Sequence, residues 1–109
     1  MWKVPLLEDT SVGRASIFVR GIFGGSPDGI AMDEAGNLSV TRFIDQEIWL
    51  FSEASKPICR VIGSTGHEHV TNLAYGGEGN KKLFITEVET SSILVAEMNV
   101  PGKIMYSHQ

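Results

Sequence analysis

The sequence predicts an all-β fold, a partial β-propeller of about two and a half four-stranded antiparallel blades. Three observations predict it: a succession of short strand patterns, an internal repeat, and a length too small for a closed ring. Runs of β-branched and aromatic residues follow one another, separated by Gly, Pro and Asn. No segment shows the 3.6-residue period of a capped amphipathic helix.

The expected strands are short and closely spaced, as in all-β proteins with many turns. Leu38-Ser39-Val40-Thr41 is typical, because its apolar and polar residues alternate like those of a half-buried strand. The strands are expected at residues 2–4, 16–19, 29–33, 38–41, 47–51, 57–62, 73–75, 83–86, 93–96 and 104–106.

The second half of the chain repeats the first. Residues 30–32 (Ile-Ala-Met) are matched by 73–75 (Leu-Ala-Tyr), and 38–41 (Leu-Ser-Val-Thr) by 83–86 (Leu-Phe-Ile-Thr). The offset is 43 residues at the first pair and 45 at the second, because extra residues enter the turn at 79–82. An insertion there costs little. Four strands that repeat every 40–50 residues or so are typical of propeller blades.

The repeat divides residues 1–109, a single partial propeller domain, into blades. Residues 27–62 are expected to form one full blade and 70–109 a second, with residues 1–20 as the outer two strands of an incomplete blade. A closed propeller needs at least four blades, or about 160 residues, so this chain cannot close alone. Because an open arc exposes sheet faces, we expect a homo-oligomer or pairing with a complementing propeller chain.

Charge and cysteine content limit the partners. A net charge of −4 without a basic stripe argues against nucleic acid. The apolar runs are too short for a membrane span, and the start is too quickly charged for a signal peptide. The single Cys59 permits no internal disulfide, which favours a cytoplasmic location. Cys59 itself is expected to be a small core side chain rather than a reactive thiol.

Several phrases of the sequence resemble the gluconolactonase and senescence-marker-protein (regucalcin-like) family. Residues 26–38 read SPDGIAMDEAGNL, similar to the family's PDGLAvDaeGNLwva. Residues 70–77 (VTNLAYGG) resemble TNLAFGG, and 82–87 (KLFITE) resemble tLyiTe. The ending at 101–108 (PGKIMYSH) is similar to the family's terminus. The resemblance covers nearly the whole chain and implies the C-terminal portion of a six-bladed, metal-dependent lactone hydrolase.

The resemblance implies a divalent cation in the central channel, commonly calcium, with zinc as the alternative. The family's metal-binding aspartate lies in its PDG motif, so the resemblance implies that Asp28 is the corresponding ligand in this chain. Asp28 also precedes an innermost strand, where it should face the channel mouth. By the repeat offset, Thr71 is equivalent to it, with Asn72 beside it, and both are candidates to line the channel. The alternatives are a turn role for Asp28 and backbone hydrogen bonds for Thr71 and Asn72.

The other two protein ligands of the family, a Glu and an Asn, belong to blades that this sequence lacks. The catalytic residues are therefore unknown, and two functions remain open. One is a lactone hydrolase that is active only when a closed propeller assembles around a small-molecule lactone. The other is a non-catalytic, self-associating fragment that serves as a binding or assembly module, or a degenerate gene product.

Two further groups of polar residues are candidate sites. His67-Glu68-His69 places two imidazoles on one side of a strand, which would make half of a zinc site, but an exposed loop is the favoured interpretation. Four acidic residues are expected to be solvated strand ends rather than an acid–base pair: Asp45, Glu47, Glu87 and Glu89.

Overall fold

The computed structural model describes residues 1–21, 26–43, 47–63 and 69–108, and the described strands form three antiparallel sheets. No helix in these ranges is long and apolar enough to cross a membrane. The elements are, in chain order, β1 (Trp2–Lys3), β2 (Ser16–Ile17), β3 (Pro27–Met32), β4 (Leu38–Arg42), β5 (Glu47–Phe51), β6 (Pro57–Ile62), β7 (Val70–Gly76), η1 (Glu78–Asn80), β8 (Lys82–Glu87), β9 (Ser92–Glu97) and η2 (Tyr106–His108).

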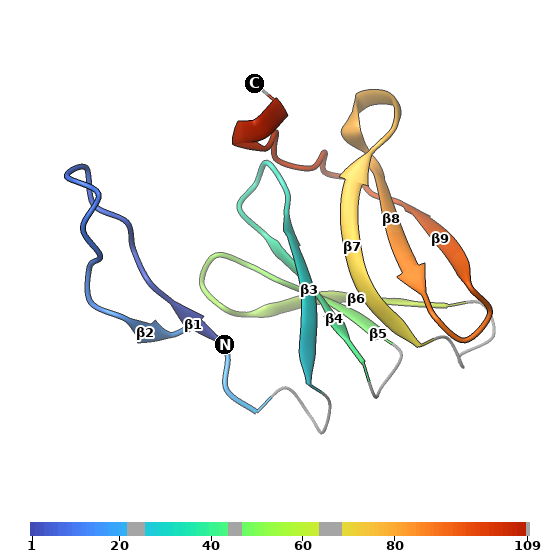
Figure 1. Cartoon of the computed structure of the whole chain (residues 1–109), viewed down its shortest axis with the longest axis horizontal. Helices are drawn as coiled ribbons and strands as arrows, with labels where there is room; N and C mark the ends of the chain where they lie inside the picture. Colours follow the sequence, from blue (N-terminus) through green and yellow to red (C-terminus); the bar gives the residue numbers. More distant parts are fainter. Residues whose placement is uncertain (22–25, 44–46, 64–68, 109) are drawn as a thin grey trace.

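The sheets are consecutive meanders, as in propeller blades. Strands β3, β4, β5 and β6 form a first blade in that order, and β7, β8 and β9 form a second. The pair β1–β2 is a separate hairpin. Figure 1 shows the hairpin on the left and the two blades fanning outward from β3 and β7, which lie side by side. The all-β, partial-propeller prediction is thus confirmed.

The core lies between the two blades. Because side chains alternate across a strand, one face of each blade carries the apolar set, and these two faces pack together. Each such side chain contributes roughly 1.5–3 kcal/mol when it is fully buried. The buried cluster consists of Ile48, Leu50, Val70, Leu73, Leu83 and Ile85.

The strand expected at residues 104–106 is not formed. After β9 the chain leaves the second blade, because residues 101–103 form backbone hydrogen bonds with Met32 and Glu34 of the first blade. The Glu34 amide donates to the Pro101 carbonyl at 2.9 Å, and the Lys103 amide donates to the Met32 carbonyl at 2.9 Å. The segment therefore crosses from the second blade to the end of β3. In the described part of the chain the second blade has three strands, and 70–109 is not the four-stranded blade predicted.

The missing strand also explains why the prediction for Cys59 is wrong. Cys59 is exposed, not a core residue. It lies on β6, the outermost strand of the first blade, on the face turned toward the second blade. No described strand lies beyond β9 to cover that position. A groove of about 150 Å³ remains there, lined in part by Cys59, Leu50 and Met98.

The N-terminal hairpin covers only part of the opposite face of the first blade. The Phe18 ring meets the edge of Phe51 with ring centroids 6.4 Å apart, and the N-terminal amine donates to the Val19 carbonyl at 2.7 Å. Beyond these contacts, apolar side chains of the hairpin face solvent. Trp2 is 70% exposed and Leu6 79%.

Replacing Gly29 tests the close approach of β3 to β7. A Cβ at Gly29 would lie 2.4 Å from Asn72 Oδ1 and 2.6 Å from Asn72 Cα. Gly29→Ala should therefore push the two strands apart and destabilise the chain by about 1–3 kcal/mol in urea denaturation. Gly76→Ala is the matched control, because its nearest neighbour is a Phe84 side-chain atom at 3.2 Å. Equal losses in the two variants would contradict the tight contact.

Candidate functional site

The predicted site residues lie where the innermost strands β3 and β7 begin. Antiparallel pairing places the ends of β4 and β8 beside these starts. Asp28 belongs to β3, and Thr71 and Asn72 belong to β7. Since β3 and β7 are neighbours, the structure brings the three predicted residues to one end of the molecule.

Asp28 differs from the aspartates that stabilise turns. The Asp33 carboxylate accepts hydrogen bonds from both nitrogens of Asn37 at 2.8 Å, and the Asp9 carboxylate accepts one from the Ser11 amide at 3.0 Å. The Asp28 side chain is exposed, and within the described ranges it makes no hydrogen bond or ion pair. The turn interpretation of Asp28 gains no support from such a bond, and its carboxylate is available to a ligand.

A β-bulge directs Asp28. Pro27 is paired with Arg42 and Ile30 with Val40, so Asp28 and Gly29 together oppose the single residue Thr41. A bulge bends its strand and re-aims the extra side chain.

The Thr41 hydroxyl replaces the backbone pairing lost at this bulge. Thr41 is fully buried, and its Oγ1 accepts a hydrogen bond from the Gly29 amide at 2.7 Å. The same hydroxyl donates to the Thr71 carbonyl, also at 2.7 Å. One side chain thus joins the residue after Asp28 to the neighbouring blade.

The second blade has the same construction. Val70 is paired with Glu87 and Asn72 with Thr86, which leaves Thr71 as the extra residue. Thr86 Oγ1 accepts a hydrogen bond from the Asn72 amide at 3.0 Å and lies 2.9 Å from Thr71 Oγ1.

Thr71 and Asn72 differ in how they are bonded. The Asn72 side-chain oxygen accepts a hydrogen bond from the Leu73 amide at 2.9 Å, which matches the backbone-bonding alternative for this residue. Thr71 is half-buried and bonds through its hydroxyl to Thr86. The roles of Asp28 as a ligand and of Thr71 and Asn72 as channel residues stay predictions.

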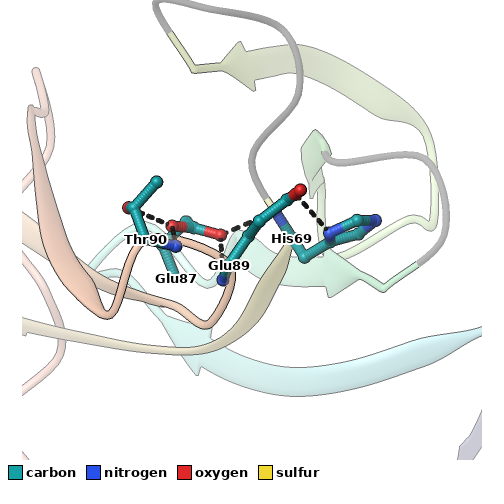
Figure 2. A network of polar contacts seen from close by, with 4 residues as sticks. All are labelled: His69, Glu87, Glu89 and Thr90. Atoms are coloured by element: carbon teal, nitrogen blue, oxygen red, sulfur yellow. Dashed lines mark hydrogen bonds and ion pairs between the residues drawn. The ribbon is translucent and has the colours of Figure 1, made fainter.

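Glu87 is a buried structural group, not the solvated strand end that we expected. Its carboxylate accepts hydrogen bonds from the amides of His69 (3.0 Å), Glu89 (2.7 Å) and Thr90 (2.8 Å), and from the Thr90 hydroxyl. Figure 2 shows this network, with His69 Nδ1 also 2.8 Å from the Glu89 carboxylate. These hydrogen bonds lower the pKa of the Glu87 carboxylate from 4.5 to about 2, and the bond from the Thr90 side chain has the largest effect. Glu87 thereby holds the start of β7, just before Thr71.

Glu47 also has structural partners. Its carboxylate accepts hydrogen bonds from Trp49 Nε1 at 2.8 Å and from Arg60 at 2.9 Å, and it lies 3.7 Å from the Arg42 guanidinium. The two guanidinium groups approach the Trp49 ring at 5.8 and 5.6 Å. Glu47 is therefore not a solvated strand end, and this cluster rigidifies the end of the first blade.

The remaining polar candidates are only partly described. Asp45, His67 and Glu68 lie outside the described residues. His69 pairs with Glu89. Across residues 1–21, 26–43, 47–63 and 69–108, no group of three or more His, Cys, Asp or Glu side chains is placed to hold a metal ion.

Comparison with known proteins agrees with this architecture. Residues 1–89 match the model of the SMP-30/Gluconolactonase/LRE-like region. The chain belongs to this family. No curated protein matches it.

A solved structure of luciferin-regenerating enzyme is similar to this SMP-30/gluconolactonase family member, with a TM-score of 0.73 and 24% sequence identity. The match covers 92% of this chain and 38% of that chain. The likeness establishes the fold as part of a six-bladed propeller.

Asp28 is the predicted site residue with the chemistry of a cation ligand. It is an exposed carboxylate at the start of an inner strand, and carboxylate oxygen suits a hard divalent cation. In the part of the chain that the structure describes, Asp28 belongs to no group of three or more such side chains that could hold a metal ion.

The Glu87 network predicts a specific acid sensitivity. Because the folded pKa lies below the ordinary value, the ionised carboxylate stabilises the fold above about pH 4.5, and this contribution is lost as the pH falls toward about 2. Glu87→Gln should lower the melting temperature at neutral pH and flatten its fall between pH 4.5 and 2, as followed by circular dichroism.

Glu97→Gln is the control for this measurement. Glu97 is exposed and lies 3.7 Å from the Lys82 amine, an ion pair of little energetic weight. A pH profile of Glu87→Gln that runs parallel to that of the wild type would refute the structural role of Glu87.

Proposed function

We propose that this chain supplies one section of a metal-dependent lactone hydrolase site of the gluconolactonase type, which becomes complete only in a closed propeller. Family membership and the position of Asp28 support the proposal. The observation that carries it is an exposed carboxylate without an internal partner among the described residues, directed by a bulge at the start of an inner strand. The missing blades come from a second copy or from a complementing propeller chain.

Asp28 would bind a divalent cation as one of several oxygen ligands. Calcium is the first choice and zinc the second, because calcium prefers carboxylate and amide oxygens. The bound cation supplies Lewis acidity toward the carbonyl of a small-molecule lactone. Thr71 and Asn72 would line the channel beside Asp28. The remaining ligands come from the other blades, since a single carboxylate does not hold a cation well.

A second candidate function is a non-catalytic assembly or binding module. The uncovered blade faces favour it. Ile93 is 66% exposed, Val95 52% and Phe84 37%, all on the face of the second blade turned away from the first. At the other end, Trp2 and Leu6 of the hairpin are also exposed. Such apolar surfaces associate with further sheet. Nucleic acid and membranes are not expected as partners, and a cytoplasmic location stays a prediction.

The hydrolase proposal predicts calcium-dependent lactone opening that requires Asp28. Asp28→Ala and Asp28→Asn should reduce turnover of simple sugar lactones to background, and should abolish the rise in melting temperature on adding calcium. Glu34→Gln is the control, because it removes an exposed carboxylate from the opposite end of the same strand hairpin. If wild-type protein shows neither turnover nor a thermal shift with calcium, the hydrolase proposal fails.

The assembly proposal predicts a defined oligomer in light scattering. Val95→Lys should shift the population toward monomer, because it places a charge on the open face of the second blade. Val88→Lys is matched in chemistry and exposure, since Val88 is 53% exposed, but it lies in the turn between β8 and β9. A stable, well-folded wild-type monomer would contradict the assembly proposal.

A further inference from the structure

We propose that Thr41 is the positioning residue for Asp28, and that Thr86 does the same for Thr71 in the second blade. The inference rests on the proposed function only in taking Asp28 as a ligand. Its physical basis is independent of any metal. A threonine at the end of each second strand binds the backbone of the bulge on the innermost strand.

The Thr41 hydroxyl has a complete set of partners. A buried hydroxyl without them would be costly. One lone pair accepts the Gly29 amide at 2.7 Å, and the proton goes to the Thr71 carbonyl at 2.7 Å, with the Gly29 carbonyl farther away at 3.3 Å. Because Gly29 follows Asp28 directly, these bonds restrict the dihedral angles that decide where the Asp28 side chain points.

The second blade repeats two of these contacts. Thr86 Oγ1 lies 3.0 Å from the Asn72 amide and 3.3 Å from the Asn72 carbonyl, and Thr41 Oγ1 lies 2.7 and 3.3 Å from the same groups of Gly29. The repeat offset aligns Thr41 with Thr86 and Gly29 with Asn72. The residue at the bulge differs, Asp28 in the first blade and Thr71 in the second, while both blades have a threonine hydroxyl beside the bulge.

The two threonines differ in their contacts between blades. Thr41 is fully buried and reaches the Thr71 carbonyl in the neighbouring blade. Thr86 is exposed and bonds within its own blade. The matched control is Ser39, a second fully buried hydroxyl on β4, whose Oγ lies 3.3 Å from the Tyr75 hydroxyl and does not bond to the bulge.

The experiment is a titration of the ¹⁵N-labelled full chain with Mn²⁺, followed by paramagnetic broadening of the Asp28 and Gly29 amide signals. Thr41→Val keeps the shape of the side chain and removes the hydroxyl, and should weaken Mn²⁺ binding at Asp28 by about 10- to 100-fold. Thr41→Ser retains the hydroxyl and should bind like wild type. Ser39→Ala should also bind like wild type. Melting temperatures of all three variants show whether each is folded.

A metal-free measurement separates this inference from the proposed function. Thr41→Val should speed hydrogen exchange of the Gly29 amide and change the backbone coupling constant of Asp28, whether or not a cation binds. If wild-type protein shows no broadening at Asp28, the metal role proposed for it fails, and the exchange data alone decide the role of Thr41.

Two results would overturn the role of Thr41. One is a folded Thr41→Val variant with unchanged exchange at Gly29. The other is an equal loss of Mn²⁺ affinity in Thr41→Val and Ser39→Ala. If Thr41→Val does not fold, hydrogen exchange in the wild-type protein is the test. The Gly29 amide must then exchange as slowly as the paired amides of β3 and β4, and fast exchange refutes the inference.

Discussion

The packing of the second blade against the first is the contact on which the rest of the structure depends. It buries the only apolar cluster of the described residues, built around Leu50 and Leu83. It requires glycine at position 29, because a Cβ there would meet Asn72. It also brings the Thr41 hydroxyl to the Thr71 carbonyl. Core burial and the candidate site are therefore consequences of one interface between two sheets.

That interface uses one face of each blade and leaves the other faces uncovered or thinly covered. The hairpin end exposes Trp2, and the far face of the second blade exposes Ile93 and Val95. The candidate site depends on the same geometry, because Asp28 and Thr71 belong to the two strands that meet at this interface. The exposed apolar side chains follow from the same arrangement, since each blade packs only one of its faces against the other.

The candidate site residues could be predicted from the sequence, but the hydrogen bonds that support them could not. The resemblance placed a ligand at Asp28, and the repeat offset placed Thr71 beside it, where the structure also brings them together. Thr41 and Thr86 were aligned by the same repeat, yet each looks like an ordinary polar residue of an alternating strand. Their role arises from bulges, and a bulge depends on how two strands pair rather than on either strand alone.

The sequence by itself determined the strands, their grouping into repeats and the family, because side-chain alternation, turn residues and motifs are local properties. Tertiary structure decided what happened at residues 104–106, whose apolar character matches that of β6 although backbone groups near Met32 draw the chain away from the sheet. It likewise decided that Cys59 is exposed and that Glu87 is buried. Each of these outcomes depends on partners distant in the chain, and no local pattern records them.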